Sequence, residues 1–546
     1  MSQSPSSQPI RFYHRGQVVE VGGEHPTRSV LDWLRGEARC TGTKEGCNEG
    51  DCGACTVVIG ELAEEGAADA IGGLRLQTVN ACIQFLPTLN GKALFTVEDI
   101  KGQCASQAGC ASQAGAAHAG AAHAGAGRAA VPLHPVQQAL VDCHGSQCGF
   151  CTPGFVMSLW SAYEHHQQAG TRPSRQQLAD ELSGNLCRCT GYRPILDAGQ
   201  RMFDLPAARL ATAPVVQALQ GLRGQEPGFD YAAANAAQGG RVDSFHAPHT
   251  LEQLAALCEA KPRARLVAGS TDVGLWVTKQ FRDLGDIVYV GGVAEMKRVQ
   301  EQAGPEGDEL YIGAGASLEA AWGALSQRFE GLTDVWLRFA SMPIRHAGTM
   351  GGNVANGSPI GDSPPVLMAL DAQIELRKGA RVRRMPLPDF YLDYMKNQLE
   401  AGEFVQGLAV PLSAARRQTR AYKISKRFDC DISALCAGMA IELDGEVVKS
   451  ARLAFGGMAA VVKRAALAEA AIVGQPWDAS AVKAAQAALA QDFRPMSDMR
   501  ASADYRLKVA QNLLQRLWLE TRPQQPLPVQ ATSVWSVMPH AAVQGA

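Results

Sequence analysis

The chain of 546 residues lacks several features that would place it in a common class of protein. It has no apolar run close to the roughly 20 residues that a membrane-spanning helix needs. Its N-terminus, MSQSPSSQPIRFYHRG, lacks the basic stretch and apolar core of a secretory signal. The formal net charge of −2 gives no basic surface for nucleic acid. We therefore expect a soluble, cytoplasmic protein with room for several domains.

A dinucleotide-binding loop of the G-x-G-x-x-G type is also missing. Gly313 and Gly315 form only a fragment of that motif, so the sequence does not support a Rossmann nucleotide site. Cysteine, by contrast, is plentiful: there are fifteen, and thirteen of them lie before residue 260. In a cytoplasmic chain, this many cysteines indicate metal binding or redox chemistry rather than disulfides.

The pattern of strand-like and helical segments changes along the chain and predicts a multidomain α+β fold. Strand-like segments come first, a helical region follows, and short strands broken by glycine alternate with helices afterwards. The expected parts are a β-rich domain (1–100), a low-complexity linker (101–130), a helical domain (131–205), a second linker (206–241), an α+β domain (242–415), a terminal α+β subdomain (416–525) and a tail (526–546).

The first linker repeats CASQAG and AAHAG within residues 103–128. Such a segment cannot bury a core and is typical of a connector. It contains Cys104, Cys110, His118 and His123, which would allow a third metal site. Repeat expansion explains the same residues without any fixed ligand geometry, and we prefer that interpretation.

The first cysteine group has the spacing C-x4-C-x2-C followed by a distant fourth cysteine. The residues are Cys47, Cys52, Cys55 and Cys82, in GCNEGDCGACTVV and NACI. This spacing is typical of a plant-type 2Fe–2S cluster, whereas zinc sites more often use C-x2-C pairs. Gly50 and Gly53 would let the loop wrap closely around such a cluster. Four unrelated free thiols are the alternative, and Cys40 is expected to be an ordinary buried residue.

The second cysteine group combines C-x2-C with C-x-C, in HGSQCGFCTPG and NLCRCTGYRP. The candidate ligands are Cys148, Cys151, Cys187 and Cys189. On spacing alone, this set fits either zinc or a 2Fe–2S cluster. A Rieske-type site would need two histidine ligands, and only His144 lies near.

Together, the two cysteine motifs resemble the iron–sulfur half of the molybdenum hydroxylases. The resemblance implies a β-grasp, plant-ferredoxin-like domain followed by a four-helix bundle, each carrying one 2Fe–2S cluster. It thereby favours iron–sulfur over zinc for Cys148, Cys151, Cys187 and Cys189.

Two glycine-bearing segments follow in the second half of the chain. LVAGSTDVG starts at Leu266, and GTMGGNVANGSPIGD runs from Gly348 to Asp362. Their small residues would let the backbone approach a pyrophosphate, although each segment alone could be a simple turn. Cys430 lies farther on, in YKISKRFDCDIS, and we assign no catalysis to it.

These segments resemble the FAD-binding region of xanthine oxidoreductases and related molybdo-flavoenzymes. The resemblance implies a two-part FAD-binding domain of the vanillyl-alcohol-oxidase (PCMH) type and a C-terminal flavoprotein subdomain, with NAD approaching near residues 422–433. The FAD-contacting residues that it implies are Leu266, Val267, Ala268, Gly269, Ser270, Thr271, Asp272, Val273, Phe339, Thr349, Met350, Gly351, Gly352, Asn353, Asp362, Val405 and Lys423.

The resemblance implies the electron-transfer subunit of a bacterial-type xanthine dehydrogenase. Electrons would pass from a molybdopterin cofactor on a large partner subunit through both clusters to FAD and then NAD, while hypoxanthine or xanthine becomes urate. The chain ends soon after the flavin region, so we expect the molybdenum centre on the partner, in a heterotetramer of two small and two large chains. The alternatives are the same relay serving an aldehyde or N-heteroaromatic hydroxylase, and a non-enzymatic zinc scaffold.

Overall fold

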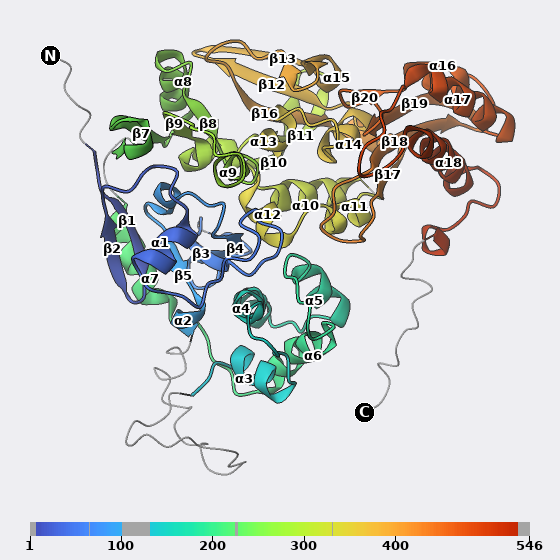
Figure 1. Cartoon of the computed structure of the whole chain (residues 1–546). Helices are drawn as coiled ribbons and strands as arrows, with labels where there is room; N and C mark the ends of the chain where they lie inside the picture. The colour runs from blue at the N-terminus through green and yellow to red at the C-terminus, as the bar shows by residue number, and fades with distance from the viewer. Residues whose placement is uncertain (1–6, 65, 101–131, 224–227, 330, 533–546) are drawn as a thin grey trace, which may run out of the picture. The chain divides into compact units, whose positions relative to one another are not determined.

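The structure is a computed structural model that describes residues 7–64, 66–100, 132–223, 228–329 and 331–532 (Figure 1). The repeat insert and its Cys104, Cys110, His118 and His123 lie outside these residues. The chain divides into two compact units, the first made of the residues before 295 together with 340–348, and the second of the remainder. In the described part of the chain, no helix is both long and apolar enough to cross a membrane.

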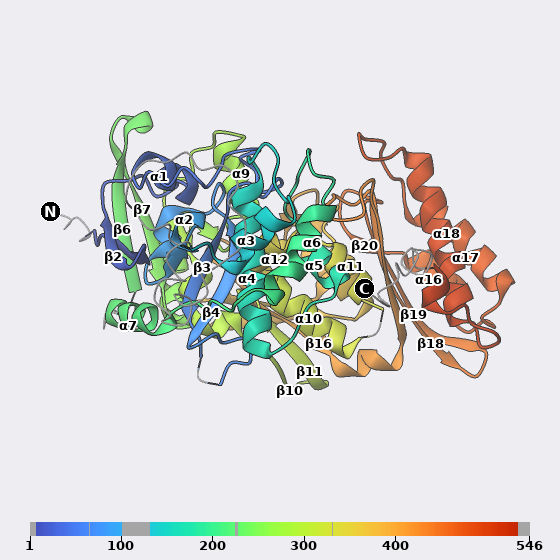
Figure 2. The same ribbon diagram turned by 90° about the horizontal axis from the view of Figure 1, so that it is seen from below.

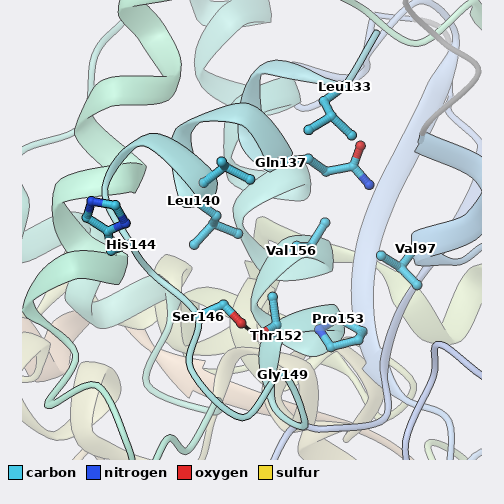
Figure 3. Close-up of a pocket in the computed structure, with 11 residues that line it drawn as sticks. Val97, Leu133, Gln137, Leu140, His144, Ser146, Gly149, Thr152, Pro153 and Val156 are labelled. Carbon is cyan, nitrogen blue, oxygen red and sulfur yellow. Dashed lines mark hydrogen bonds between the residues drawn. The ribbon is translucent and has the colours of Figure 1, made fainter. Parts of the chain in front are cut away.

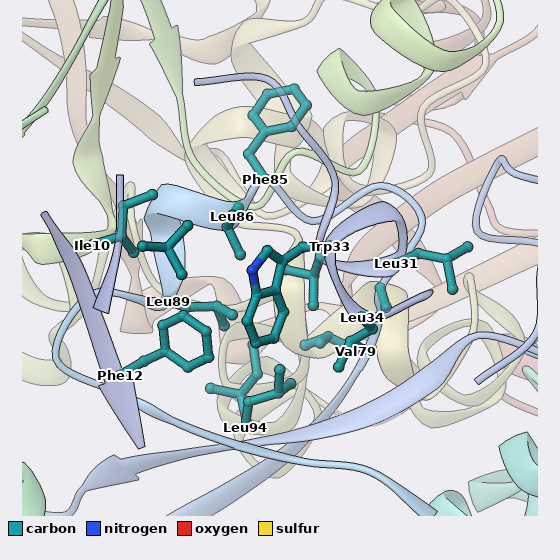
Figure 4. Packing of buried hydrophobic residues seen from close by; sticks show 14 of the residues in the cluster. Ile10, Phe12, Leu31, Trp33, Leu34, Val79, Phe85, Leu86, Leu89 and Leu94 are labelled. Atoms are coloured by element: carbon teal, nitrogen blue, oxygen red, sulfur yellow. The ribbon is translucent and has the colours of Figure 1, made fainter. Parts of the chain in front are cut away.

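The first unit begins with a five-stranded sheet in the order β2-β1-β5-β3-β4. The rings of Phe12 and Trp33 pack edge to face, with their centroids 5.1 Å apart, in an apolar core between this sheet and α1 (Figure 4). The β-rich character predicted for the first hundred residues is therefore confirmed. The elements are β1 (Ile10–His14), β2 (Gln17–Val21), α1 (Val30–Gly36), β3 (Thr56–Leu62), β4 (Leu74–Asn80), β5 (Ala93–Phe95) and α2 (Val97–Ile100).

The predicted helical region packs on the other face of that sheet. Val58 of β3 lies in a second core together with Trp160, and Phe95 of β5 contacts Trp160 at 5.4 Å. Because successive residues of a strand face opposite sides, β3 contributes to both cores. The helices described here are α3 (Pro135–Asp142), α4 (Thr152–Ala169), α5 (Arg175–Glu181) and α6 (Arg193–Arg201).

The expectation of a linker over residues 206–241 is wrong for much of that segment. Residues 212–222 form α7 (Thr212–Leu222), which buries Val215 and Leu219, and residues 228–235 form β6 (Gly228–Asn235). β6 pairs along its whole length with β7 (Arg241–Pro248). The alanine-rich sequence resembled a linker because its strand is stabilised by this pairing rather than by its own propensity.

A second sheet of the first unit has the order β6-β7-β9-β8. Thr250 and Gln253 form a capping box that opens α8, as Ser174 and Gln177 do at α5. The remaining elements of this unit are α8 (Leu251–Ala260), β8 (Arg265–Val267), α9 (Val273–Thr278), β9 (Ile287–Tyr289) and α12 (Met342–Ala347).

The second unit contains a five-stranded antiparallel sheet in the order β10-β11-β16-β12-β13. Trp322 of α10 and Leu367 of α14 are fully buried within this unit. The elements are β10 (Val299–Gly304), β11 (Gly307–Gly313), α10 (Leu318–Arg328), α11 (Thr333–Arg338), α13 (Met350–Ala355), α14 (Ser363–Ala369), β12 (Gln373–Lys378), β13 (Arg381–Pro386), α15 (Leu387–Phe390), β14 (Tyr391–Asp393), β15 (Lys396–Asn397) and β16 (Phe404–Pro411).

A four-stranded sheet, β17-β18-β19-β20, completes the second unit. Three helices gather on one face of it, as Figure 2 shows, and their apolar residues share a core with β18 and β19. This is the predicted order of strands before alanine-rich helices. The elements are β17 (Gln418–Ile424), β18 (Leu435–Asp444), β19 (Val447–Gly456), β20 (Lys463–Arg464), α16 (Ala466–Ile472), α17 (Ala479–Asp492) and α18 (Ala503–Thr521).

Candidate functional site

The first cysteine group converges in the loop between α1 and β3. Cys47, Cys52 and Cys55 come from this loop, and Cys82 follows the end of β4. The Cys47 thiol interacts with those of Cys52 and Cys82, and Cys82 also interacts with Cys55. The Cys52 amide adds a hydrogen bond to the Cys47 sulfur at 3.3 Å. The four predicted ligands are therefore neighbours in space.

These contacts separate the acidities of the four thiols. Hydrogen bonds from Cys52 and then Cys82 lower the pKa of Cys47, and the Cys82 thiol lowers the pKa of Cys55. The pKa of Cys52 and that of Cys82 rise, first because each donates to a neighbouring sulfur and then because both are desolvated. Thiolate is the form that binds a metal.

The predicted glycines of this loop have the conformations that the close wrapping needs. Gly50 and Gly53 have φ values of +80° and +69°, in the left-handed region where only glycine is unstrained. A Cβ at Gly50 would lie 2.6 Å from the Ile83 side chain, next to Cys82. Because Gly50 and Gly53 lack side chains, the loop can lie close to the four cysteines.

The second cysteine group forms two contacting pairs. Cys151 immediately precedes α4 and donates to Cys187, while Cys189 donates to Cys148. Burial first, and then the bond to Cys187, raises the pKa of Cys151 to about 12. Burial alone would raise the pKa of Cys187, but hydrogen bonds from Thr190, at 3.2 and 3.5 Å, outweigh it and lower that pKa.

The contacts within the second group connect Cys151 with Cys187 and Cys189 with Cys148. A structural zinc ion needs four ligands around one point, whereas each iron of a 2Fe–2S cluster takes two thiolates. The contacts fit both arrangements.

A cavity of about 570 Å³ lies beside the loop that carries Cys148 and Cys151 (Figure 3). Its walls come from α2, α3 and the first turns of α4, and they are mainly apolar, with Val97, Leu140 and Val156 among them. Cys148 and Cys189 are exposed, and the Phe150 side chain between the cysteines of this loop is 47% exposed. This face of the helical region combines candidate ligands with uncovered apolar surface.

The first glycine-bearing segment lies in the first unit, between β8 and α9. A Cβ at Gly269 would lie 1.7 Å from the Ala347 carbonyl oxygen, so this position requires glycine. Ser270 has a φ of +58°, and its hydroxyl is buried without a hydrogen-bond partner among the described residues. An unsatisfied hydroxyl on a strained residue is a reason to look for a ligand there. Of the other residues implied in this segment, Leu266 and Val267 lie in β8, Val273 begins α9, and the rest lie in the turn between them.

The second glycine-bearing segment lies in the second unit and opens α13. Thr349 caps the helix, and Gly351 is pressed against Ala314, where a Cβ would meet backbone and side-chain atoms at 2.3–2.7 Å. The Asn353 Oδ1 is buried and has no hydrogen-bond partner in the described part of the chain. Gly352 is exposed. The orphaned amide oxygen beside a bare backbone suits a polar ligand such as FAD.

Asp362 and Lys423 form a buried ion pair in the second unit. The Lys423 Nζ donates to Asp362 Oδ2 at 2.6 Å and to Ser433 Oγ at 2.7 Å, and Ser433 donates to Asp362 Oδ1 at 2.6 Å. Both carboxylate oxygens, expected to be available for ligand hydroxyls, are thus engaged within the protein. Phe339 packs against Trp322 at 5.9 Å, and Val405 is buried in β16.

Two residues that the sequence reasoning missed organise these regions. Arg338 holds the loop after β17: its guanidinium lies 4.3 Å from the Phe428 ring centre and its Nε donates to the Phe428 carbonyl at 3.1 Å. Asn185 is buried between the two cysteine groups. Neither belongs to a local motif, because the partners of each lie far away in sequence.

Comparison with known families gives three matches along the chain. Residues 122–200 match a 2Fe–2S binding domain. Residues 239–413 match the FAD binding domain in molybdopterin dehydrogenase, and residues 420–521 match the CO dehydrogenase flavoprotein C-terminal domain. The first range includes the second cysteine group, and the second includes both glycine-bearing segments.

Whole-chain relatives carry several names. The xanthine dehydrogenase of Emericella nidulans is 30% identical over 536 residues, covering 89% of this chain and 36% of that protein. The xanthine dehydrogenase of Drosophila subobscura is 31% identical over 530 residues, covering 87% and 36%. Aldehyde oxidase 4 of Cavia porcellus is 27% identical over 605 residues, covering 100% and 42%. The chain thus spans little more than a third of the length of the relatives it matches.

Among solved structures, the carbon monoxide dehydrogenase from Hydrogenophaga pseudoflava has a TM-score of 0.47 and 25% identity, covering 50% of this chain and 94% of that chain. Quinoline 2-oxidoreductase from Pseudomonas putida 86 has a TM-score of 0.47 and 23% identity, covering 52% and 98%. Taken together, the three domain matches show that segments of this chain are similar to a 2Fe–2S binding domain, to the FAD binding domain in molybdopterin dehydrogenase and to the CO dehydrogenase flavoprotein C-terminal domain.

Proposed function

We propose that this protein is the electron-transfer part of a xanthine dehydrogenase. In this proposal it receives electrons from a molybdenum centre on a partner chain and delivers them to NAD while hypoxanthine or xanthine is hydroxylated. The observation that supports it most directly is the convergence of eight cysteine thiols into two groups within one compact unit. When bound, two 2Fe–2S clusters would supply one-electron transfer, and FAD would couple it to two-electron chemistry.

The residues of the chain would hold and tune these groups. Cys47, Cys52, Cys55 and Cys82 are the proposed ligands of one cluster, and Cys148, Cys151, Cys187 and Cys189 those of the other. Hydrogen bonds to the sulfurs from the Cys52 amide and from Thr190 stabilise negative charge, and such bonds raise a cluster's reduction potential. Burial of Cys55 and Cys82, each 1% exposed, keeps water from the first group.

One contact within the first unit supports a path towards the flavin. Helix α9, which follows the Ser270 segment, rests on the loop of the first cysteine group: Thr278 donates to the Asn48 carbonyl at 2.9 Å, and Lys279 donates to the Cys47 carbonyl. A Cβ at Gly274 would lie 2.8 Å from Ile83, next to Cys82. We propose that the Ser270 segment binds FAD and so lies beside the first cluster. For the second unit, we propose that Phe339, Val405, Asp362, Lys423 and the residues from Thr349 to Asn353 contact the same cofactor.

The exposed face of the second cysteine group is the proposed docking place of the molybdenum-bearing partner. Two of its four thiols are exposed, and bare apolar side chains and the 570 Å³ cavity lie next to them. A partner covering this face would remove the second cluster from water and shorten the distance to its own centre. We propose an assembly of two copies of each chain in the cytoplasm.

A second candidate function keeps the same relay but changes the substrate of the partner. The similarity to aldehyde oxidase 4 of Cavia porcellus favours considering aldehydes. The relay residues of this chain are the same in either case, so the identity of the co-purifying partner separates the two.

The first test is a cysteine substitution read by electron paramagnetic resonance. The purified chain should contain four irons, four sulfides and one FAD, and reduction should give two distinct cluster signals. Cys148→Ser should abolish one signal and keep the other signal and the FAD. Cys143→Ser is the matched control, because Cys143 lies in the same helical region but outside both groups. Two surviving signals in Cys148→Ser would refute the assignment of the second group.

The second test concerns the electron acceptor. NADH should bleach the flavin absorbance of the isolated chain anaerobically, without any molybdenum present, because the proposed hydride exchange needs only FAD and the NAD site. A flavin that dithionite bleaches but NADH leaves oxidised would mean that NAD is not the acceptor.

A further inference from the structure

The loops that carry the two cysteine groups are joined by one main-chain hydrogen bond. The Leu186 amide donates to the Cys52 carbonyl at 3.0 Å. Cys52 belongs to the first group, and Leu186 is bonded directly to Cys187 of the second. A ligand of one proposed cluster is therefore connected to a ligand of the other through two peptide units and a single hydrogen bond.

The buried side chain of Asn185 holds this junction in place. Its side chain is 3% exposed, and its Nδ2 donates to the Gly53 carbonyl at 3.1 Å and to Thr56 Oγ1 at 3.3 Å. Its Oδ1 accepts a hydrogen bond from Ser158 of α4 at 2.7 Å. Both amide hydrogens and the oxygen are thus used across three separate segments. A buried network with every member satisfied is rigid, because each group that breaks away loses a hydrogen bond that water cannot replace.

Two glycines let the loops meet without a side chain between them. A Cβ at Gly53 would lie 2.2 Å from the Gly184 carbonyl oxygen, and a Cβ at Gly154 would lie 2.1 Å from the Gly53 carbonyl oxygen. Gly154 stands in the first turn of α4, directly after Cys151 and Thr152. Any larger residue at either position must push backbone atoms apart and lengthen the junction.

We propose that the Cys52–Leu186–Cys187 junction is the route by which an electron passes between the two clusters, and that Asn185 is the positioning residue that holds it. The inference rests on the proposed function. One electron leaves the cluster bound by the second group, which is oxidised, and reduces the cluster bound by the first group. No bond is made or broken and no proton moves. The rate of such a transfer falls exponentially with separation, so a fixed, side-chain-free contact matters more than the chemistry of the residues.

The test uses the full chain with both clusters loaded. Asn185→Ala removes the three side-chain hydrogen bonds of Asn185. Gly154→Ala pushes α4 away from the Cys52 loop without removing any polar group. Gly199→Ala is the matched control: it also adds a methyl group to a helix of the same region, but its Cβ meets only the Leu178 and Leu159 side chains, at 3.0–3.4 Å. Ser158→Ala is a milder variant in case Asn185→Ala does not fold.

Two measurements distinguish an electron-transfer route from a purely structural role of Asn185 and Gly154. The first is the magnetic coupling between the two reduced clusters, seen as splitting or broadening of their paramagnetic resonance lines. The second is the rate at which an electron equilibrates between the clusters after sub-stoichiometric reduction, followed by rapid-freeze spectroscopy. We expect weaker coupling and a several-fold slower equilibration in Asn185→Ala and Gly154→Ala, with full iron content and wild-type values in Gly199→Ala.

The outcomes distinguish this inference from the function on which it rests. If the wild-type chain shows fewer than two cluster signals, the proposed function fails. If both signals are present but coupling and rate are unchanged in every variant that folds, the route is wrong and the proposed function stands. The route is also wrong if coupling declines only in proportion to lost iron, because that result describes a structural residue.

Discussion

Replacing Lys423 by Met should destabilise the second unit by an amount that the structure allows us to work out. Met has nearly the same length and volume as Lys but no charge, so packing is largely preserved. The side chains of Lys423 and Asp362 are only 1% and 4% exposed, and their charged atoms lie 2.6 Å apart. The substitution therefore leaves a carboxylate buried without its cation.

Removing one partner of a buried ion pair typically costs about 3–5 kcal/mol. Here the Ser433 hydroxyl still donates to Asp362 at 2.6 Å, so we expect the lower end, about 3 kcal/mol. Adding Asp362→Asn removes the orphaned charge and keeps an acceptor for Ser433. The double variant should therefore be more stable than Lys423→Met alone, with a coupling energy of about 2 kcal/mol.

The measurement is urea unfolding together with hydrogen exchange of peptides from β17 and β18, which pair along Gln418–Ile424 and Leu435–Ile441. It must be made on flavin-free protein, because bound FAD would add its own stabilisation. Faster exchange in β17 and β18 that reverses in the double variant would support the argument. Destabilisation below about 1 kcal/mol, or a double variant that simply adds the two single effects, would show that the pair contributes no more than a surface ion pair.

Two further predictions concern the first unit. Burial lowers the pKa of His134 from 6.5 to about 4, so His134 stays neutral in the folded state at pH values where it takes up a proton in the unfolded chain. We therefore expect α3 to lose about 3 kcal/mol of stability as the pH falls from 6.5 to 4. Hydrogen exchange of α3 measured against pH should show this loss, and His134→Gln should remove most of the pH dependence. Ser270→Gly relieves the strain of the positive φ and removes the hydroxyl that has no hydrogen-bond partner among the described residues. The fold should persist, while FAD affinity should fall about tenfold, which is the equivalent of one hydrogen bond. An unchanged Kd in a flavin fluorescence titration would show that Ser270 does not contact FAD.

Features encoded by neighbouring residues could be predicted from the sequence. The capping boxes at Ser174 and Thr250 are local, so their four-residue patterns were sufficient. The cysteine spacing likewise identified which thiols come together in the first group. For the second group, spacing left zinc open, and the similarity of residues 122–200 to a 2Fe–2S binding domain favours iron–sulfur.

Features that depend on distant partners could not be predicted. Strand β6 was mistaken for linker because its stability comes from β7. Asn185 carries no sequence signal, since its partners Gly53 and Thr56 lie 132 and 129 residues away. The ion pair between Asp362 and Lys423, 61 residues apart, likewise has no signal in the sequence. In each case the deciding interaction is a hydrogen bond between elements that only the fold brings together.

The difference in burial between the two cysteine groups bears on the direction of the relay. Cys55 and Cys82 of the first group are each 1% exposed, and Cys47 and Cys52 are partly exposed. In the second group Cys148 and Cys189 are exposed, Cys151 is partly exposed and Cys187 is buried. A cluster that exchanges electrons with another protein must come near the surface, while one that exchanges them inside the chain gains from exclusion of water. The second group therefore suits contact with a partner, and the first suits transfer towards the α9 side of the unit. Between them, Gly53 and Gly154 bring the two loops into backbone contact, which is the arrangement that an internal transfer step requires.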